Sequence, residues 1–283
     1  MQVFKEKEAL QYAIKTEKSK GKSLGLVPTM GALHQGHLSL VKEALETCDF
    51  VVVSIFVNPT QFNNSTDLEK YPRTLEKDLS LLQDLDGEIY VFVPTANELY
   101  GKDIISEHFD FEGLEKVMEG KFRNGHFDGV GTVVKLLFTT IEPDKAFFGE
   151  KDYQQLQIIR KLTEKAQIPV EIIGCPILRE ESGLARSSRN ERLSEPHRQK
   201  AAFIYQTLLK TKELFGTKSA EYIDQWVKEE FEKCPLLQLE YFEIANERTL
   251  KKISHKRKGN QYRAFIAVYA DDVRLIDNIA LNN

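Results

Sequence analysis

Two histidines stand three residues apart in Pro28-Thr29-Met30-Gly31-Ala32-Leu33-His34-Gln35-Gly36-His37, just before an apolar run with helical spacing at residues 38–45. The stretch is typical of a strand, a glycine-bearing loop and a helix start. His37 then falls on the first helical turn, near the exposed N–H groups and the positive dipole end that attract anions. This pattern predicts a site that handles phosphate. The alternative, that one histidine caps the helix and the other is exposed, stays open on this stretch alone.

Two further polar segments follow predicted strands, at residues 58–62 and 149–152. Each has a structural alternative: Asn58-Pro59 as a turn, Gln61 as a surface residue, and Lys151 with Asp152 as a solvated pair at a helix start. Because all three polar segments follow strands, they are expected to meet at the carboxyl edge of one sheet. That convergence favours a ligand site over three unrelated loops.

Helical and extended patterns alternate through the first part of the chain. Apolar runs predict strands at residues 23–27, 50–57, 88–93, 145–148 and 170–173, and periodicity predicts helices at 9–20, 75–85, 130–141 and 153–165. Residues 114–118 are expected to form a helical turn and residues 119–129 a loop. The alternation predicts an α/β fold with an open, doubly wound parallel sheet, in which ligands bind near the switch point.

The character of the chain changes near residue 175. Residues 175–190 are rich in hydroxyl and guanidinium groups, which suit phosphate oxygens, although a hydrophilic linker is the alternative. Helices are predicted from 193 to 215 and from 220 to 231, and strands at 236–244, 262–269 and 273–276. This half is expected to form a small α+β domain, with the boundary near residues 175–185.

Composition excludes several classes of protein. A net charge of −4 over 283 residues argues against a nucleic-acid binder, and the basic run at 251–258 is expected to be a solvated hairpin loop. Three single cysteines indicate neither a disulfide framework nor a zinc site and fit a reducing cytoplasm. No window reaches the length of a membrane span, and the N-terminus resembles no secretory signal.

The chain resembles the pantoate–beta-alanine ligase family over nearly its whole length. The residues that carry this resemblance are the 28–37 motif, Phe56-Val57-Asn58-Pro59-Thr60-Gln61-Phe62, Tyr71-Pro72-Arg73-Thr74, Arg123 with Gly125-His126-Phe127, Phe147-Phe148-Gly149-Glu150-Lys151-Asp152-Tyr153-Gln154-Gln155, and Ser187-Ser188-Arg189-Asn190. The His-x-Gly-His element alone would indicate only the wider nucleotidylyltransferase superfamily, which includes class I aminoacyl-tRNA synthetases. Here the chain lacks room for an anticodon-binding domain.

The resemblance implies a Rossmann-like domain at residues 1–177 that binds ATP and pantoate, and a C-terminal α+β lid and closing domain at 178–283. It implies a cytoplasmic homodimer acting on small molecules, without nucleic acid or membrane. The carboxylate of pantoate attacks the α-phosphorus of ATP, and the amine of beta-alanine then displaces AMP from pantoyl adenylate. ATP is a substrate with Mg²⁺ on its phosphates, with no organic cofactor and no dedicated metal ligand on the protein.

The resemblance also implies a role for individual residues. His34, His37 and Lys151 are the expected catalytic residues, with His37 also as proton donor. Pantoate is expected at Pro28, Met30, Gln61 and Gln155, and beta-alanine at Gln61. The residues expected at ATP are Met30, Gly31, Ala32, Leu33, His34, Gln35, Gly36, His37, Gly149, Glu150, Lys151, Asp152, Leu178, Arg186, Ser187, Ser188 and Arg189.

Three positions depart from the pattern expected of the family. Arg186 replaces a hydrophobic residue and Ser182 an aspartate, so loop closure differs or Arg186 adds a phosphate contact. Lys77 beside Asp78 replaces a second acid, which leaves a magnesium ligand there in doubt. The rival functions are a nucleotidylyltransferase that stops at pyrophosphate release and a nucleic-acid module. The first would need a second phosphate cradle where Gln61 and Gln155 offer neutral amides.

Overall fold

The computed structural model describes residues 1–62, 68–69 and 71–282. The chain forms two compact units, which we call the larger unit (residues 1–150 and 154–176) and the smaller unit (residues 151–153 and 177–283). Residues 151–153 lie in sequence between the two stretches of the larger unit, yet they group with the smaller one. Within the described residues, no helix is long and apolar enough to cross a membrane.

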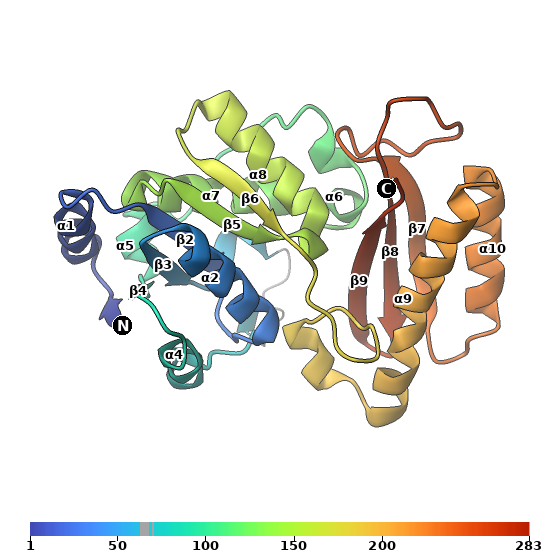
Figure 1. The fold of residues 1–283 in the computed structure, drawn as a ribbon, viewed down its shortest axis with the longest axis horizontal. Coiled ribbons are helices and arrows are strands. Elements are labelled where there is room, and N and C mark those ends of the chain that lie inside the picture. The colour runs from blue at the N-terminus through green and yellow to red at the C-terminus, as the bar shows by residue number, and fades with distance from the viewer. Residues whose placement is uncertain (63–67, 70, 283) are drawn as a thin grey trace. The chain divides into compact units, whose positions relative to one another are not determined.

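The larger unit is built on a parallel sheet of six strands in the order β1-β4-β3-β2-β5-β6 (Figure 1). Five of these strands were predicted from apolar runs. The sixth, β1, was not predicted, because a three-residue edge strand carries no such pattern. The strands are β1 (Gln2–Phe4), β2 (Leu24–Thr29), β3 (Phe50–Ile55), β4 (Ile89–Phe92), β5 (Lys145–Gly149) and β6 (Glu171–Cys175). The predicted α/β class with a doubly wound parallel sheet is confirmed.

Two helices cover one face of this sheet. Helix α2 (Gln35–Thr47) and helix α4 (Leu75–Gln83) pack their apolar stripes against alternate residues of the strands, such as Val27, Val53 and Phe147. Burial of this apolar area is the main stabilising term for the unit. The other helices of the unit are α1 (Lys7–Lys18), α5 (Ala96–Tyr100), α6 (Glu119–Phe122), α7 (His126–Ile141) and α8 (Tyr153–Ala166).

The strand order reverses around β2, which pairs with β3 on one side and β5 on the other. The register with β3 runs to Thr29, whereas the register with β5 ends at Leu26 opposite Ala146. Pro28 follows two residues later and has no N–H to donate to a neighbouring strand. The sheet therefore opens between the ends of β2 and β5, which is where ligands bind in such sheets.

The expected loop at residues 119–129 is wrong. Helix α6 occupies Glu119–Phe122, and α7 begins at His126 after Gly125, which has a φ of +73°. The predicted helix began only at residue 130, just after Gly129, and glycine is a poor helix former. Gly129 is needed for close packing, since a Cβ there would lie 2.4 Å from the carbonyl oxygen of Thr60.

The smaller unit consists of an antiparallel sheet and two long helices. Strands β7 (Gln238–Asn246), β8 (Tyr262–Ala270) and β9 (Val273–Ala280) follow one another in the sheet. Helices α9 (Glu195–Phe215) and α10 (Ala220–Glu232) lie side by side against it and share one apolar core with it (Figure 1). Strand β9 extends four residues beyond the predicted end at Ile276. The apolar pattern stops there because the next two residues of the strand, Asp277 and Asn278, are polar although buried.

Candidate active site

The two histidines of the 28–37 motif lie at the beginning of α2. His34 is the N-cap residue, and its Nδ1 accepts a hydrogen bond from the Gly36 N–H at 3.0 Å. The Nδ1 atom of His37 accepts from the His34 N–H at 3.4 Å, and the two ring centroids are 4.1 Å apart. The structural alternative therefore holds for His34, which caps the helix. His37 is half-buried instead of exposed.

These hydrogen bonds fix the tautomer of both rings. A ring nitrogen that accepts a hydrogen bond carries no proton, so each neutral imidazole keeps its proton on Nε2. His34 and His37 thus present two Nε2–H donors from the positive end of one helix. Such donors stabilise negative charge that develops on an oxygen atom.

A buried carboxylate holds the loop that leads to these histidines. Asp78, on α4, is 1% exposed and accepts the N–H groups of Ala32 at 2.9 Å and Leu33 at 2.8 Å. The loop needs this support because Gly31 and Ala32 have φ values of +84° and +50°. Sequence reasoning treated Asp78 only as a doubtful metal ligand. The signal for a buried role was a carboxylate on the apolar stripe of an amphipathic helix.

The carboxyl ends of β2 and β3 bring Met30 and Gln61 together. Gln61, in the 3₁₀ turn η1 (Pro59–Gln61), donates from Nε2 to the Met30 Sδ at 2.9 Å. Its Oε1 accepts from the Asn58 Nδ2 at 3.1 Å, and its backbone oxygen is 3.0 Å from the His126 Nδ1. Since a carbonyl oxygen only accepts, the His126 Nδ1 is protonated. Buried Asn58 and His126 thus orient Gln61.

The two glutamines at the start of α8 have different surroundings. Gln154 is buried and donates from Nε2 to the backbone oxygens of Leu114 and Val117, both at 2.8 Å. Its Oε1 accepts the Glu119 N–H at 3.0 Å, so this amide secures the turn before α6. Gln155, the expected pantoate residue, is half-buried at the third position of α8.

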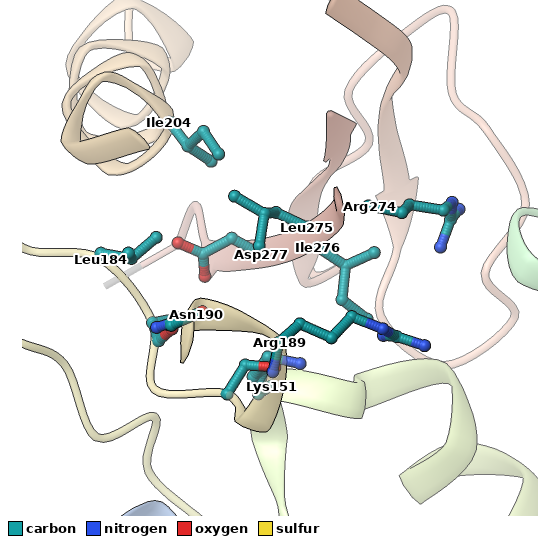
Figure 2. Close-up of a pocket in the computed structure, with 11 residues that line it drawn as sticks. Lys151, Leu184, Arg189, Asn190, Ile204, Arg274, Leu275, Ile276 and Asp277 are labelled. Carbon is teal, nitrogen blue, oxygen red and sulfur yellow. The ribbon is translucent and has the colours of Figure 1, made fainter. Parts of the chain in front are cut away.

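In the smaller unit, three of the expected site residues line one pocket (Figure 2). Lys151, Ser187 and Arg189 contribute to its wall, and Asp277 reaches it from β9. The Lys151 side chain is 16% exposed, and its Nζ lies 3.6 Å from the Asp152 Oδ2. Leu184, Ile204 and Leu275 line the same pocket, so its wall combines cationic, acidic and apolar side chains.

The loop that carries Ser187 and Arg189 follows a short hairpin. The Arg186 N–H donates to the Leu178 carbonyl at 2.9 Å, and Arg179 bridges to Ala185 within the hairpin. Leu178 is 39% exposed, and Arg186 directs its Nη1 to within 3.8 Å of the Glu180 Oε1.

The residues after the hairpin are held as well. The Ser187 Oγ accepts the Arg189 N–H and caps the 3₁₀ turn η4 (Ser188–Arg192). Buried Asn190 donates from Nδ2 to the Ala185 carbonyl and to the Glu180 Oε1, both at 3.1 Å. These bonds tie the segment with Ser187 and Arg189 to the hairpin before it.

A buried ion pair anchors this hairpin to β9. Arg179 donates to both oxygens of Asp277, at 2.6 and 2.9 Å, and its guanidinium stacks 3.6 Å from the Tyr205 ring centroid. Burial raises the pKa of Asp277, and the hydrogen bonds and charge of Arg179 oppose that rise. Sequence analysis missed this pair, because the predicted strand ended at Ile276 and Asp277 was given no role.

The sequence left a magnesium ligand at Asp78, beside Lys77, in doubt. Within residues 1–62, 68–69 and 71–282, no group of three or more His, Cys, Asp or Glu side chains could hold a metal ion. Both Asp78 oxygens already accept hydrogen bonds from the loop and from Thr74. Mg²⁺ prefers to keep waters and phosphate oxygens as ligands.

Comparisons with known proteins place this chain in a family. The model of the family described as pantoate-beta-alanine ligase matches residues 2–280. The chain is 68% identical to a pantothenate synthetase of Christiangramia forsetii over 100% of both chains. A pantothenate synthetase structure from Thermus thermophilus has a TM-score of 0.91 at 38% identity and covers 100% of both chains.

A third comparison concerns a structure with ligands. A pantoate–beta-alanine ligase of Francisella tularensis, complexed with beta-gamma ATP and beta-alanine, has a TM-score of 0.80 at 34% identity. It covers 100% of this chain and 98% of the other. The chain belongs to the pantoate–beta-alanine ligase family. It is an ATP-dependent ligase that condenses pantoate with beta-alanine to give pantothenate.

Proposed function

We propose that His34, His37 and Lys151 carry the first of two steps in this ligation. In that step a pantoate carboxylate oxygen bonds to the α-phosphorus of ATP, and the bond to the β-phosphate oxygen breaks, releasing pyrophosphate. Negative charge builds on the α-phosphate oxygens. The two imidazole Nε2–H groups and the Lys151 ammonium are the groups proposed to stabilise it.

The observation that carries this proposal is the hydrogen-bond pattern at the start of α2. Both Nδ1 atoms accept backbone N–H groups, so the Nε2–H donors are fixed in direction before a ligand arrives. Preorganised donors need no reorientation during the reaction and therefore favour the transition state over the ground state. His37 is also proposed as proton donor.

In the second step, the amine nitrogen of beta-alanine attacks the acyl carbon of pantoyl adenylate. The acyl carbon–oxygen bond breaks, AMP leaves, and the amine loses a proton as the amide forms. Gln61 is proposed to contact pantoate and beta-alanine, with Pro28, Met30 and Gln155 also at pantoate. Support for Gln61 comes from Asn58 and His126, which fix its amide and its backbone.

We further propose that ATP contacts residues 30–37 and 149–152, Leu178 and residues 186–189. The cationic side chains of Lys151 and Arg189, which line one pocket of the smaller unit, support a contact with the anionic phosphates. When bound with the nucleotide, Mg²⁺ would neutralise charge on the phosphate oxygens. Arg186 is proposed to add a phosphate contact, in competition with its partner Glu180.

We infer that the protein is a cytoplasmic homodimer. The free, buried thiols of Cys48, Cys175 and Cys234 are consistent with a reducing compartment. Burial raises the pKa of Cys175 to about 12, so this thiol stays protonated and unreactive. Light scattering coupled to gel filtration tests the dimer, and a mass of one 32.5 kDa chain would contradict it.

The proposed roles are tested by separating the first step from substrate binding. His37→Ala and Lys151→Met should each lower pantoyl adenylate formation in a rapid-quench experiment by about a hundredfold or more. Their pantoate dissociation constants should change by less than about threefold. The reverse result, normal adenylate formation at saturation with much weaker pantoate binding, would reject the catalytic roles.

A further inference from the structure

Lys151 lies on a segment that belongs structurally to the smaller unit. Residues 151–153 follow β5 and include Tyr153, the first residue of α8, and Tyr153 and Lys151 both contact the C-terminal sheet. The Tyr153 ring packs against Phe265 with centroids 5.9 Å apart, and the Arg263 guanidinium lies 3.9 Å from the Tyr153 ring centroid. Both partners lie on β8.

The direct contact with Lys151 comes from Asn278 on β9. The Asn278 Nδ2 donates to the Lys151 backbone oxygen at 2.9 Å. Asn278 is 2% exposed, so this amide is withheld from water and its hydrogen bonds hold it in one orientation. Its Oδ1 accepts from the Arg263 Nη1 at 2.6 Å, and its N–H donates to the Asp277 Oδ1 at 2.8 Å.

The same two residues of β9 also fix the hairpin before Ser187 and Arg189. Asp277 accepts both guanidinium N–H groups of Arg179, which is the first bridged residue of that hairpin. The adjacent residues Asp277 and Asn278 therefore hold the hairpin before Ser187 and the backbone of Lys151. Figure 2 shows Asp277 and Lys151 at the same pocket. Burying an aspartate, two arginines and an asparagine is costly unless each is paired, as they are here.

We propose that Asn278 is a positioning residue for Lys151 and acts on pantoyl adenylate formation only through the Lys151 backbone. This inference rests on the proposed role of Lys151. Displacing a charged group by about 1 Å costs roughly a hundredfold in rate when the group must meet a developing charge. Loss of the Asn278 hydrogen bond should therefore lower the rate of adenylate formation while leaving the pantoate site unchanged.

The test is a double-mutant cycle read by pantoate-dependent ATP–pyrophosphate exchange. Asn278→Ala removes the amide without adding charge, and Asn278→Asp keeps an acceptor for Arg263 but cannot donate to the Lys151 oxygen. Each should lower the exchange rate at saturating substrates tenfold or more, with the pantoate dissociation constant within about threefold of wild type. In the Lys151→Met background, the same substitutions should lower the residual exchange by less than about threefold.

The control is Asp272→Asn, which removes an exposed ion pair with Arg192 from the same unit and should leave exchange unchanged. Circular dichroism and the thermal midpoint confirm folding, and either Asn278 variant suffices if the other does not fold. Equal loss from Asn278→Ala with and without Lys151 would overturn the positioning role alone. If Lys151→Met itself retains wild-type exchange, the proposed role of Lys151 fails and this inference fails with it.

Discussion

Asp78 is predicted to be the main support of the loop that carries His34 and His37. Its two oxygens accept the N–H groups of Ala32 and Leu33 at 2.9 and 2.8 Å, inside a core where the carboxylate is 1% exposed. Hydrogen bonds to a charged group contribute about 1.5–3 kcal/mol each. Removing both with Asp78→Ala should lower the free energy of unfolding by about 3–6 kcal/mol.

The conservative change has a smaller expected effect. Asp78→Asn keeps one acceptor and turns a donor toward the other N–H group, so the expected loss is about half, roughly 1.5–3 kcal/mol. Urea unfolding measures both variants. Asp84→Asn, which changes an exposed carboxylate at the end of the same helix, is the matched control and should lie within about 0.5 kcal/mol of wild type.

The activity of these variants separates a loop support from a metal ligand. Where Asp78→Asn is folded, its exchange rate should fall at least about tenfold because the histidine donors lose their fixed direction. Its half-maximal Mg²⁺ concentration should stay unchanged. Asp78→Ala with wild-type stability and normal exchange would refute the reasoning, and a shifted Mg²⁺ requirement would assign Asp78 to the metal instead.

Two further predictions concern packing and pH. Gly129→Ala places a Cβ 2.4 Å from the Thr60 oxygen, so it should destabilise the protein by about 1–3 kcal/mol, despite the better helix propensity of alanine, and raise the KM for pantoate. The control Gly216→Ala, whose Cβ meets nothing closer than 3.7 Å, should leave stability unchanged. Equal melting temperatures for the two variants would contradict this prediction. Burial acts to raise the pKa of Asp224, but hydrogen bonds from Lys228 and Lys252 keep it below 3.8, so its stabilisation is present above that pH and is lost as the pH falls through the folded value. Asp224→Asn should therefore cost up to about 1 kcal/mol at pH 7 and progressively less as the pH falls below 3.8, as urea titrations across this pH range would show.

Long periodic patterns predicted most of the fold. The strands at residues 50–57 and 145–148 were identifiable because strands buried on both faces of a parallel sheet are continuously apolar. The start of α7 was missed because Gly129, a poor helix former, is needed there for packing against the distant Thr60 backbone. Neither the three-residue β1 nor this close approach leaves a local signal, since both depend on tertiary contacts.

Only the parts of the candidate site that lie in recognisable sequence motifs could be predicted. The polar segments after β2, β3 and β5 were expected at one sheet edge, and β2 and β3 do bring Met30 and Gln61 into contact. The supporting roles of Asp78, His126 and Asn278 were not predicted. Each of these side chains hydrogen-bonds to a backbone group far away in sequence. The sequence does not show such partners, so a buried polar side chain cannot be told from an exposed one by its residue type.

The central claim is that this chain forms pantoyl adenylate before beta-alanine reacts. The most direct measurement is ATP–pyrophosphate exchange with labelled pyrophosphate, Mg²⁺ and pantoate, in the absence of beta-alanine. Exchange that requires pantoate, together with AMP release once beta-alanine is added, is the predicted result. A well-folded sample that shows no exchange, and forms no AMP with all three substrates present, would contradict the account.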